Sequence, residues 1–285
     1  MTDVHWAAII VSYMPGPELK AAVEAVLAAG ADRVVVWDNS PDDSAADLLA
    51  GVHGPVLVHG DGTNYGFGVA NNKAAETLRG EYEYLFLVNP DCIVREDTPE
   101  KLLAALQQND RLAAVSPRMR YPDGKMGIAG GPFPSILKEV GSDTGIDGFL
   151  PEALRDLVLR AWGWRPGRRG SGAYGVSFKE SGVNIVDWIS GFAIMTRADR
   201  FVEVGGFDSN YFLYFEDVDL AHSFRDKGYG VAIVGQAEAL HLESISTSVG
   251  GKSNVYKAGR RVYFSRRGGR LSRFVARRIW GRADV

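Results

Sequence analysis

Residues 211–219, YFLYFEDVD, place three carboxylates directly after a group of aromatic side chains. Aromatic neighbours exclude water from a carboxylate, which disfavours its charged form and raises its pKa toward the working range of a general base. The segment therefore favours a reaction centre built on Glu216, Asp217 or Asp219. Helix capping is the alternative, because acidic residues in a first turn complement the helix dipole without any chemistry.

Polar residues also follow short apolar segments in the first part of the chain. Four such segments predict buried strands, at residues 6–13, 33–37, 55–59 and 84–88, and helical patterns separate them at residues 18–29, 43–50 and 68–79. This alternation predicts βαβ units in a Rossmann-like, doubly wound and mostly parallel sheet, whose ligands bind at the carboxyl ends of the strands. Asp38, Asn39 and Asp91 lie at those ends.

The second half of the chain has a different pattern. Extended segments on either side of Pro117, followed by the turn signal Asp123-Gly124, predict a hairpin or a meander. Residues 127–183 are rich in Gly and Pro and predict an irregular insertion with one short helix near residues 151–161. Further strands are predicted at residues 187–196, 229–234 and 237–242, with helices from Arg197 and over residues 217–227.

Composition restricts the class of protein. The chain has 285 residues, 46% hydrophobic and 24% charged, which is typical of a globular enzyme or binding domain. A single cysteine, Cys92, excludes an internal disulfide framework and a cysteine-rich zinc site. No apolar segment approaches the ~18 residues that span a bilayer, and the start has no signal-peptide pattern. We therefore expect a cytoplasmic protein.

Charge is distributed very unevenly along the chain. Residues 257–285 hold ten basic residues and one acid, whereas residues 1–256 hold 22 basic and 34 acidic residues. The apolar residues of this tail recur at helical spacing, at Leu271, Phe274, Val275 and Ile279. A basic amphipathic helix favours contact with an anionic membrane surface. A terminal helix docked on the domain is the alternative, and nucleic acid is not expected because the rest of the chain is acidic.

Seven motifs occur in a recognisable order. They are VSY at residues 11–13, WDNS at 37–40, NYGFGVANN at 64–72, LVNPD at 87–91, SGFA at 190–193, FEDVD at 215–219 and His241. Together they resemble family 2 glycosyltransferases of the GT-A fold, most closely the bacterial rhamnosyltransferase-type enzymes. The resemblance implies an inverting transfer of a sugar, with L-rhamnose from dTDP-rhamnose as the candidate, to a glycan or polyprenyl-linked acceptor. Such an enzyme would act in cell-envelope polysaccharide synthesis, on the inner face of the membrane.

The resemblance assigns nucleotide binding to residues of the first half. These are Ser12, Asp38, Asn39, Asn64, Gly66, Phe67, Asn72 and Asn89. The carboxylate of Asp38 would accept the N3–H of uracil or thymine, so that the donor is a dTDP- or UDP-sugar. The alternative for Asp38 is an Asx-turn that ends the strand.

The motif Asn89-Pro90-Asp91 occupies the position of the family's metal-binding Asp-x-Asp, with asparagine in place of the first aspartate. The resemblance implies Asp91 and His241 as ligands of Mn²⁺ or Mg²⁺, which would neutralise the charge of the departing diphosphate. A structural histidine is the alternative for His241. Residues 244–254, rich in Ser and Gly, are expected to form a mobile flap over the nucleotide.

The same resemblance implies that Asp217 is the catalytic base and that Glu216 positions the acceptor or exchanges roles with it. Asp219 is expected to point away, as a helix cap or a partner for Arg225.

Gly191 matches a small residue that lets a strand approach the donor sugar. Trp164 and Trp188 are candidates for stacking on sugar faces, with core packing as the alternative.

These assignments divide the chain into a nucleotide-sugar-binding half (residues 1–110), an acceptor-binding and catalytic half (111–256) and the basic tail (257–285). A sugar-phosphate nucleotidyltransferase would need a Gly-rich basic loop after the first strand, which residues 12–16 lack. A non-catalytic module that binds nucleotide sugars or nucleic acid would not need Asp91, Asp217 and His241 together. Oligomeric state is left open.

Overall fold

The computed structural model describes residues 5–42, 44–136, 138–140, 179–242 and 249–281. The strands are β1 (Trp6–Ser12), β2 (Arg33–Asp38), β3 (Val56–Gly60), β4 (Tyr84–Val88), β5 (Cys92–Val94), β6 (Leu112–Arg120), β7 (Gly130–Gly131), β8 (Val183–Val186), β9 (Trp188–Ile189), β10 (Ala193–Arg197) and β11 (Gly230–His241). The helices are α1 (Glu18–Ala28), α2 (Ser44–Leu49), α3 (Gly66–Thr77), α4 (Thr98–Gln107), α7 (Ala198–Glu203), α8 (Glu216–Asp226), α9 (Val249–Arg266) and α10 (Arg270–Trp280).

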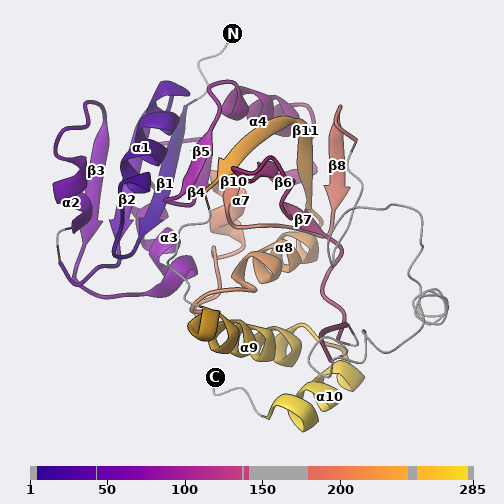
Figure 1. Cartoon of the computed structure of the whole chain (residues 1–285). Coiled ribbons are helices and arrows are strands. Elements are labelled where there is room, and N and C mark those ends of the chain that lie inside the picture. Colours follow the sequence, from indigo (N-terminus) through magenta and orange to yellow (C-terminus); the bar gives the residue numbers. More distant parts are fainter. Residues whose placement is uncertain (1–4, 43, 137, 141–178, 243–248, 282–285) are drawn as a thin grey trace.

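Nine of the described strands form one sheet in the order β3-β2-β1-β4-β10-β6-β11-β5, with β8 paired to β11 (Figure 1). The first four positions of this order are parallel neighbours, as the sequence predicts. Every residue of β1 and β4 is buried, because helices and the rest of the sheet remove water from both faces. The strand β5 and the helix α4 were not predicted.

The antiparallel strand β10 inserts between β4 and β6. Ala193 of β10 lies opposite Val88 of β4, and the N–H of Asn89 donates to the carbonyl of Phe192 at 2.9 Å. Strands from residues 1–110 and 111–256 therefore share one sheet, and the turn around Gly191 lies beside the carboxyl end of β4.

Two predictions for the middle of the chain are wrong in detail. Pro117 does not divide the chain, because β6 runs through it as one strand and β11 changes register there, between Val234 and Glu238. The strands expected on both sides of residue 235 are the single strand β11. The turn at Asp123-Gly124 is confirmed, since the N–H of Gly124 donates to the carbonyl of Tyr121.

The C-terminal helices cover α8 on the side away from the sheet, with α10 beyond α9 (Figure 1). A second hydrophobic cluster holds them together; it consists of Ile136, Tyr211, Phe215, Val218, Val262, Tyr263, Phe264 and Ala276. The predicted loop is wrong for residues 249–254, which begin α9, and residues 244–248 lie outside the described part. The tail is two helices, of which α9 contributes to the core.

Two other predictions concern residues outside the described part of the chain. Trp164 and the short helix near residues 151–161 lie outside the described residues. Among the helices that the structure describes, none is long and apolar enough to cross a membrane.

Candidate active site

A strained turn presents the carboxylates at the start of α8. Tyr214 and Phe215 have φ angles of 68° and 71°, in the left-handed region that bulky residues rarely adopt. Phe215 is held there by burial in the second hydrophobic cluster, with its ring 5.4 Å from that of Tyr263. Left-handed backbone of this kind concentrates at functional sites, where the surrounding packing pays for the strain. The turn ends at Glu216 and Asp217.

Asp217 meets the glycine turn before β10. Its Oδ2 accepts the N–H of Gly191 at 2.9 Å, and its Oδ1 accepts the N–H of Val218 at 2.8 Å. Burial raises the pKa of Asp217 to about 6, and these N–H groups limit the rise. A side chain at Gly191 would bring a Cβ within 3.1 Å of the Phe67 ring, so glycine allows the two segments to approach. The result is a carboxylate that titrates near neutrality.

Glu216 lies beside Asp217 in a drier environment. The residue is 4% exposed, and its Oε2 has no hydrogen-bond partner among the described residues. Burial, together with the neighbouring charge of Asp217, raises the pKa of Glu216 well above its ordinary value. Two buried carboxylates so close together titrate as a coupled pair, and the pKa of each is raised.

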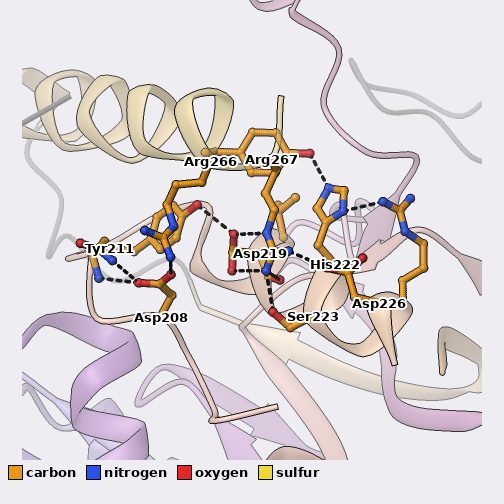
Figure 2. A network of polar contacts seen from close by, with 12 residues as sticks. Asp208, Tyr211, Asp219, His222, Ser223, Asp226, Arg266 and Arg267 are labelled. Atoms are coloured by element: carbon orange, nitrogen blue, oxygen red, sulfur yellow. Dashed lines mark hydrogen bonds and ion pairs between the residues drawn. The ribbon is translucent and has the colours of Figure 1, made fainter. Parts of the chain in front are cut away.

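Asp219 faces the opposite side of α8. Arg267 binds it with two contacts, Nε to Oδ1 at 2.6 Å and Nη2 to Oδ2 at 2.9 Å, and the hydroxyl of Tyr211 donates to Oδ1 at 3.1 Å. Figure 2 shows Arg267 also reaching Ser223 and Asp226, at 2.6 and 2.8 Å.

The expected partner of Asp219 was therefore wrong. Arg225 contacts His222 Nδ1 at 2.7 Å instead. Asp219 clamps α8 to the end of α9, which leaves Glu216 and Asp217 as the candidates for chemistry.

Three strand ends bring Asn89, Asp91 and His241 together. Asp91 Oδ1 lies 3.3 Å from His241 Nε2, and the amide nitrogen of Asn89 lies 3.5 Å from the same atom. The pairing of β5 with β11, with Cys92 opposite His241, fixes this contact across the sheet. The described residues contain no group of three or more His, Cys, Asp or Glu side chains that could hold a metal. Asp91 and His241, predicted as metal ligands, are therefore in contact, and the amide of Asn89 lies beside them.

At the end of β2, Asp38 and Asn39 make local contacts. The carboxylate of Asp38 accepts the N–H of Ser40 at 3.0 Å and the N–H of Ala45 at 3.1 Å, which forms the Asx-turn given above as the alternative. Asn39 donates to the carbonyl of Gly66 at 3.0 Å. Carboxylate oxygens accept more than one hydrogen bond, so recognition of the base by Asp38 stays a prediction. Ser12 is buried at the end of β1.

The segment before α3 is tied to the segment before α8. Gly66 has a φ of 74°, and a Cβ there would lie 2.2 Å from the carbonyl oxygen of Phe212. Asn64 accepts the N–H of Gly66, and the N–H of Phe67 donates to Phe212.

Asn72 brackets the backbone of Phe207 with both atoms of its amide, at 2.8 and 2.9 Å. Asn72, predicted to bind nucleotide, thus acts in this structure by joining the two halves of the chain.

Residues 7–144 match the family model of glycosyl transferase family 2. The chain therefore contains a glycosyl transferase family 2 domain. The match contains Asp38, Asn89 and Asp91, whereas Asp217 and His241 lie beyond it.

The enzyme is 29% identical over 260 residues to the N-acetylglucosaminyl-diphospho-decaprenol L-rhamnosyltransferase of Mycobacterium tuberculosis (strain H37Rv), covering 87% of this chain and 78% of the relative. It is 26% identical over 220 residues to rhamnosyltransferase WbbL of Escherichia coli (strain K12), covering 73% of this chain and 72% of the relative. A crystal structure of GalNAc-T7 with UDP, GalNAc and Mn²⁺ superposes with a TM-score of 0.60 at 14% identity, over 97% of this chain and 54% of that one. This likeness shows the GT-A fold.

Trp188 of the glycosyltransferase is partly buried. Its indole N–H donates to the carbonyl of Pro132 at 2.9 Å, and its ring packs against both hydrophobic clusters. Trp188 therefore has the core-packing role that was the alternative to stacking on a sugar. The strained turn and the contact of Arg267 with Asp219 could not be predicted from the sequence, because no local pattern marks a left-handed aromatic residue or a partner 48 residues away.

Proposed function

We propose that this glycosyltransferase inverts the anomeric centre as it moves a sugar, with L-rhamnose as the leading candidate, from a dTDP- or UDP-sugar to a polyprenyl-diphosphate-linked glycan. The names of two relatives support rhamnose, and one of those names specifies a decaprenol-linked acceptor. The observation that carries the proposal is the buried carboxylate pair against Gly191, with Asp217 titrating near pH 6. Such a step would belong to cell-envelope polysaccharide synthesis, on the inner face of the membrane.

Asp217 acts as the base in this proposal. Its carboxylate takes the proton of an acceptor hydroxyl while that oxygen attacks the anomeric carbon, and the bond from carbon to the nucleotide diphosphate breaks on the opposite face. The raised pKa of Asp217 makes it a stronger base than an exposed aspartate while leaving it ionised at neutral pH. Burial and the charge of Asp217 disfavour the charged form of Glu216, which would otherwise repel the diphosphate.

Asn89, Asp91 and His241 fit a divalent cation. A carboxylate, an amide oxygen and an imidazole suit Mn²⁺ or Mg²⁺, and so small a set leaves positions for diphosphate oxygens and water. The cation would neutralise negative charge on the leaving diphosphate. The Nε2 atom of His241 faces both Asp91 and Asn89, so it is the ring nitrogen that would coordinate the cation.

The remaining assignments follow the halves of the chain. Residues 1–110 bind the nucleotide through the ends of β1, β2 and β4, and residues 111–256 bind the acceptor. Gly191 and Trp188 lie on the acceptor half next to the base, where the donor sugar would be transferred.

A transfer assay tests the function. Purified enzyme is incubated with Mn²⁺, an N-acetylglucosaminyl diphosphate polyprenol and either dTDP-L-rhamnose or UDP-N-acetylglucosamine, and the anomeric configuration of the product is read by NMR. The proposal expects rhamnose transfer with inversion, lost in chelator. Transfer from neither donor, or a retained configuration, would contradict it.

A further inference from the structure

The outward face of α10 carries large apolar side chains that the fold leaves in solvent. Leu271, Phe274 and Ile279 are 75%, 67% and 47% exposed. They recur at helical spacing, whereas Ala276 is buried and Val275 packs against the second hydrophobic cluster. Three such side chains on a helix of 11 residues form a patch rather than scattered exposure.

Basic charge surrounds this patch. Arg270, Arg277 and Arg278 are exposed on α10, and no described acidic side chain forms an ion pair with them. Two arginines that lie just before α10 differ, because Arg266 pairs with Asp208 and Arg267 with Asp219. The charge of α10 is therefore available to an external anion, whereas the charge at the end of α9 is used within the fold.

The helix is held in one orientation. The guanidinium of Arg260 lies 4.0 Å from the ring of Trp280, and Arg261 donates to the carbonyl of Trp280 at 3.2 Å. α10 lies at the edge of the molecule, on the side of α9 away from the sheet (Figure 1). The patch therefore faces outward on a fixed support, where a flat surface can reach it.

We infer that α10 docks on an anionic lipid bilayer. Leu271, Phe274 and Ile279 enter the headgroup boundary, and the arginines contact lipid phosphates. The occupant is a membrane because the patch combines exposed apolar area with unneutralised positive charge, and the inference also rests on the proposed polyprenyl acceptor, which lies in a membrane. Since α9 carries α10 and is clamped to α8 through Arg267, docking brings the catalytic carboxylates to the membrane that holds the acceptor.

Substitution is the right test here, because truncation after residue 257 would remove the buried Val262 and Phe264 along with Arg267. Full-length enzyme is sedimented with vesicles of phosphatidylcholine, with and without phosphatidylglycerol. We expect salt-sensitive binding to the anionic vesicles, reduced at least ~100-fold by Arg270→Gln/Arg277→Gln/Arg278→Gln. Leu271→Ser/Phe274→Ser/Ile279→Ser should reduce binding to both kinds of vesicle.

A matched control uses apolar residues exposed elsewhere. Val183→Ser/Ile185→Ser/Val202→Ser removes exposed side chains of β8 and α7 and should leave vesicle binding unchanged. Absence of wild-type binding to anionic vesicles, or undiminished binding by the α10 variants, would overturn the inference. So would a dimer, or an RNA complex, that depends on the same residues without vesicle binding. Because sedimentation needs no donor or acceptor, a failed transfer assay with intact vesicle binding counts against the proposed function alone.

Discussion

Asp217 and Asp219 lie two residues apart on α8 but have opposite surroundings. Asp217 accepts N–H groups from Gly191 and Val218, and burial raises its pKa to about 6. Asp219 is 2% exposed and receives a two-contact guanidinium from Arg267. The partner of a buried carboxylate thus decides its role. A guanidinium compensates the negative charge and makes the carboxylate a structural contact, whereas backbone N–H groups leave it able to take a proton.

Removal of the Arg267 guanidinium should have the largest effect on the stability of the fold. Arg267→Ala leaves Asp219 buried without its cation, and we expect the free energy of unfolding to fall by about 3–5 kcal/mol. Denaturant unfolding measures this change. Arg266→Ala is the matched control, because the pair of Arg266 with Asp208 is more exposed and should contribute at most ~1 kcal/mol. Equal losses for the two variants would contradict a structural role specific to Asp219.

Asp91 is a third carboxylate, with an imidazole as its neighbour. Asp91→Ala should weaken the binding of dTDP or UDP at least ~10-fold when Mn²⁺ is present, and should have little effect in chelator. Calorimetry with both nucleotides measures this difference. Asp38→Ala should weaken binding under both conditions. Equal affinity of the wild type with Mn²⁺ and with chelator would contradict a role for the metal in nucleotide binding.

The raised pKa of Asp217 predicts a pH-dependent effect on stability. A folded-state pKa of about 6, above the ordinary 3.8, means that stability contributed by the protonated form is lost as pH rises from about 4 to 6. Asp217→Asn does not ionise, so this loss should be absent from the variant. Its amide nitrogen cannot accept an N–H from Gly191 or Val218 as the replaced oxygen does, so the quantity compared is the change of stability with pH. Thermal unfolding from pH 4 to pH 7 measures this change in both proteins, and an equal pH dependence in the variant and the wild type would contradict the titration of Asp217.

Local periodicity was enough to predict the first half of the sheet. The apolar segments that became β1, β2 and β4 and the polar residues after them are adjacent in sequence, so the strand ends that carry Asp38 and Asp91 could be found. The contact of Asp91 with His241 needed the family resemblance, because these residues are far apart along the chain and meet through the pairing of β5 with β11.

Long-range packing decided what the sequence could not predict. The arginine content of residues 257–285 concealed that Val262, Tyr263 and Phe264 are buried. Asp219 was expected to cap its helix or to pair with Arg225, whereas its partner is Arg267, which α9 brings to α8 from 48 residues away. A pattern within one helix contains no information about such a partner.

The turnover of Asp217→Asn tests the central claim most directly. Asparagine keeps the shape of the side chain and cannot take the hydroxyl proton at neutral pH, so transfer at saturating donor and acceptor should fall at least ~100-fold while nucleotide affinity is unchanged. Glu216→Gln, measured beside it, should lose less because Glu216 does not take the hydroxyl proton in this assignment. A near-normal rate for Asp217→Asn, or a larger loss for Glu216→Gln, would contradict the assignment of Asp217 as the base.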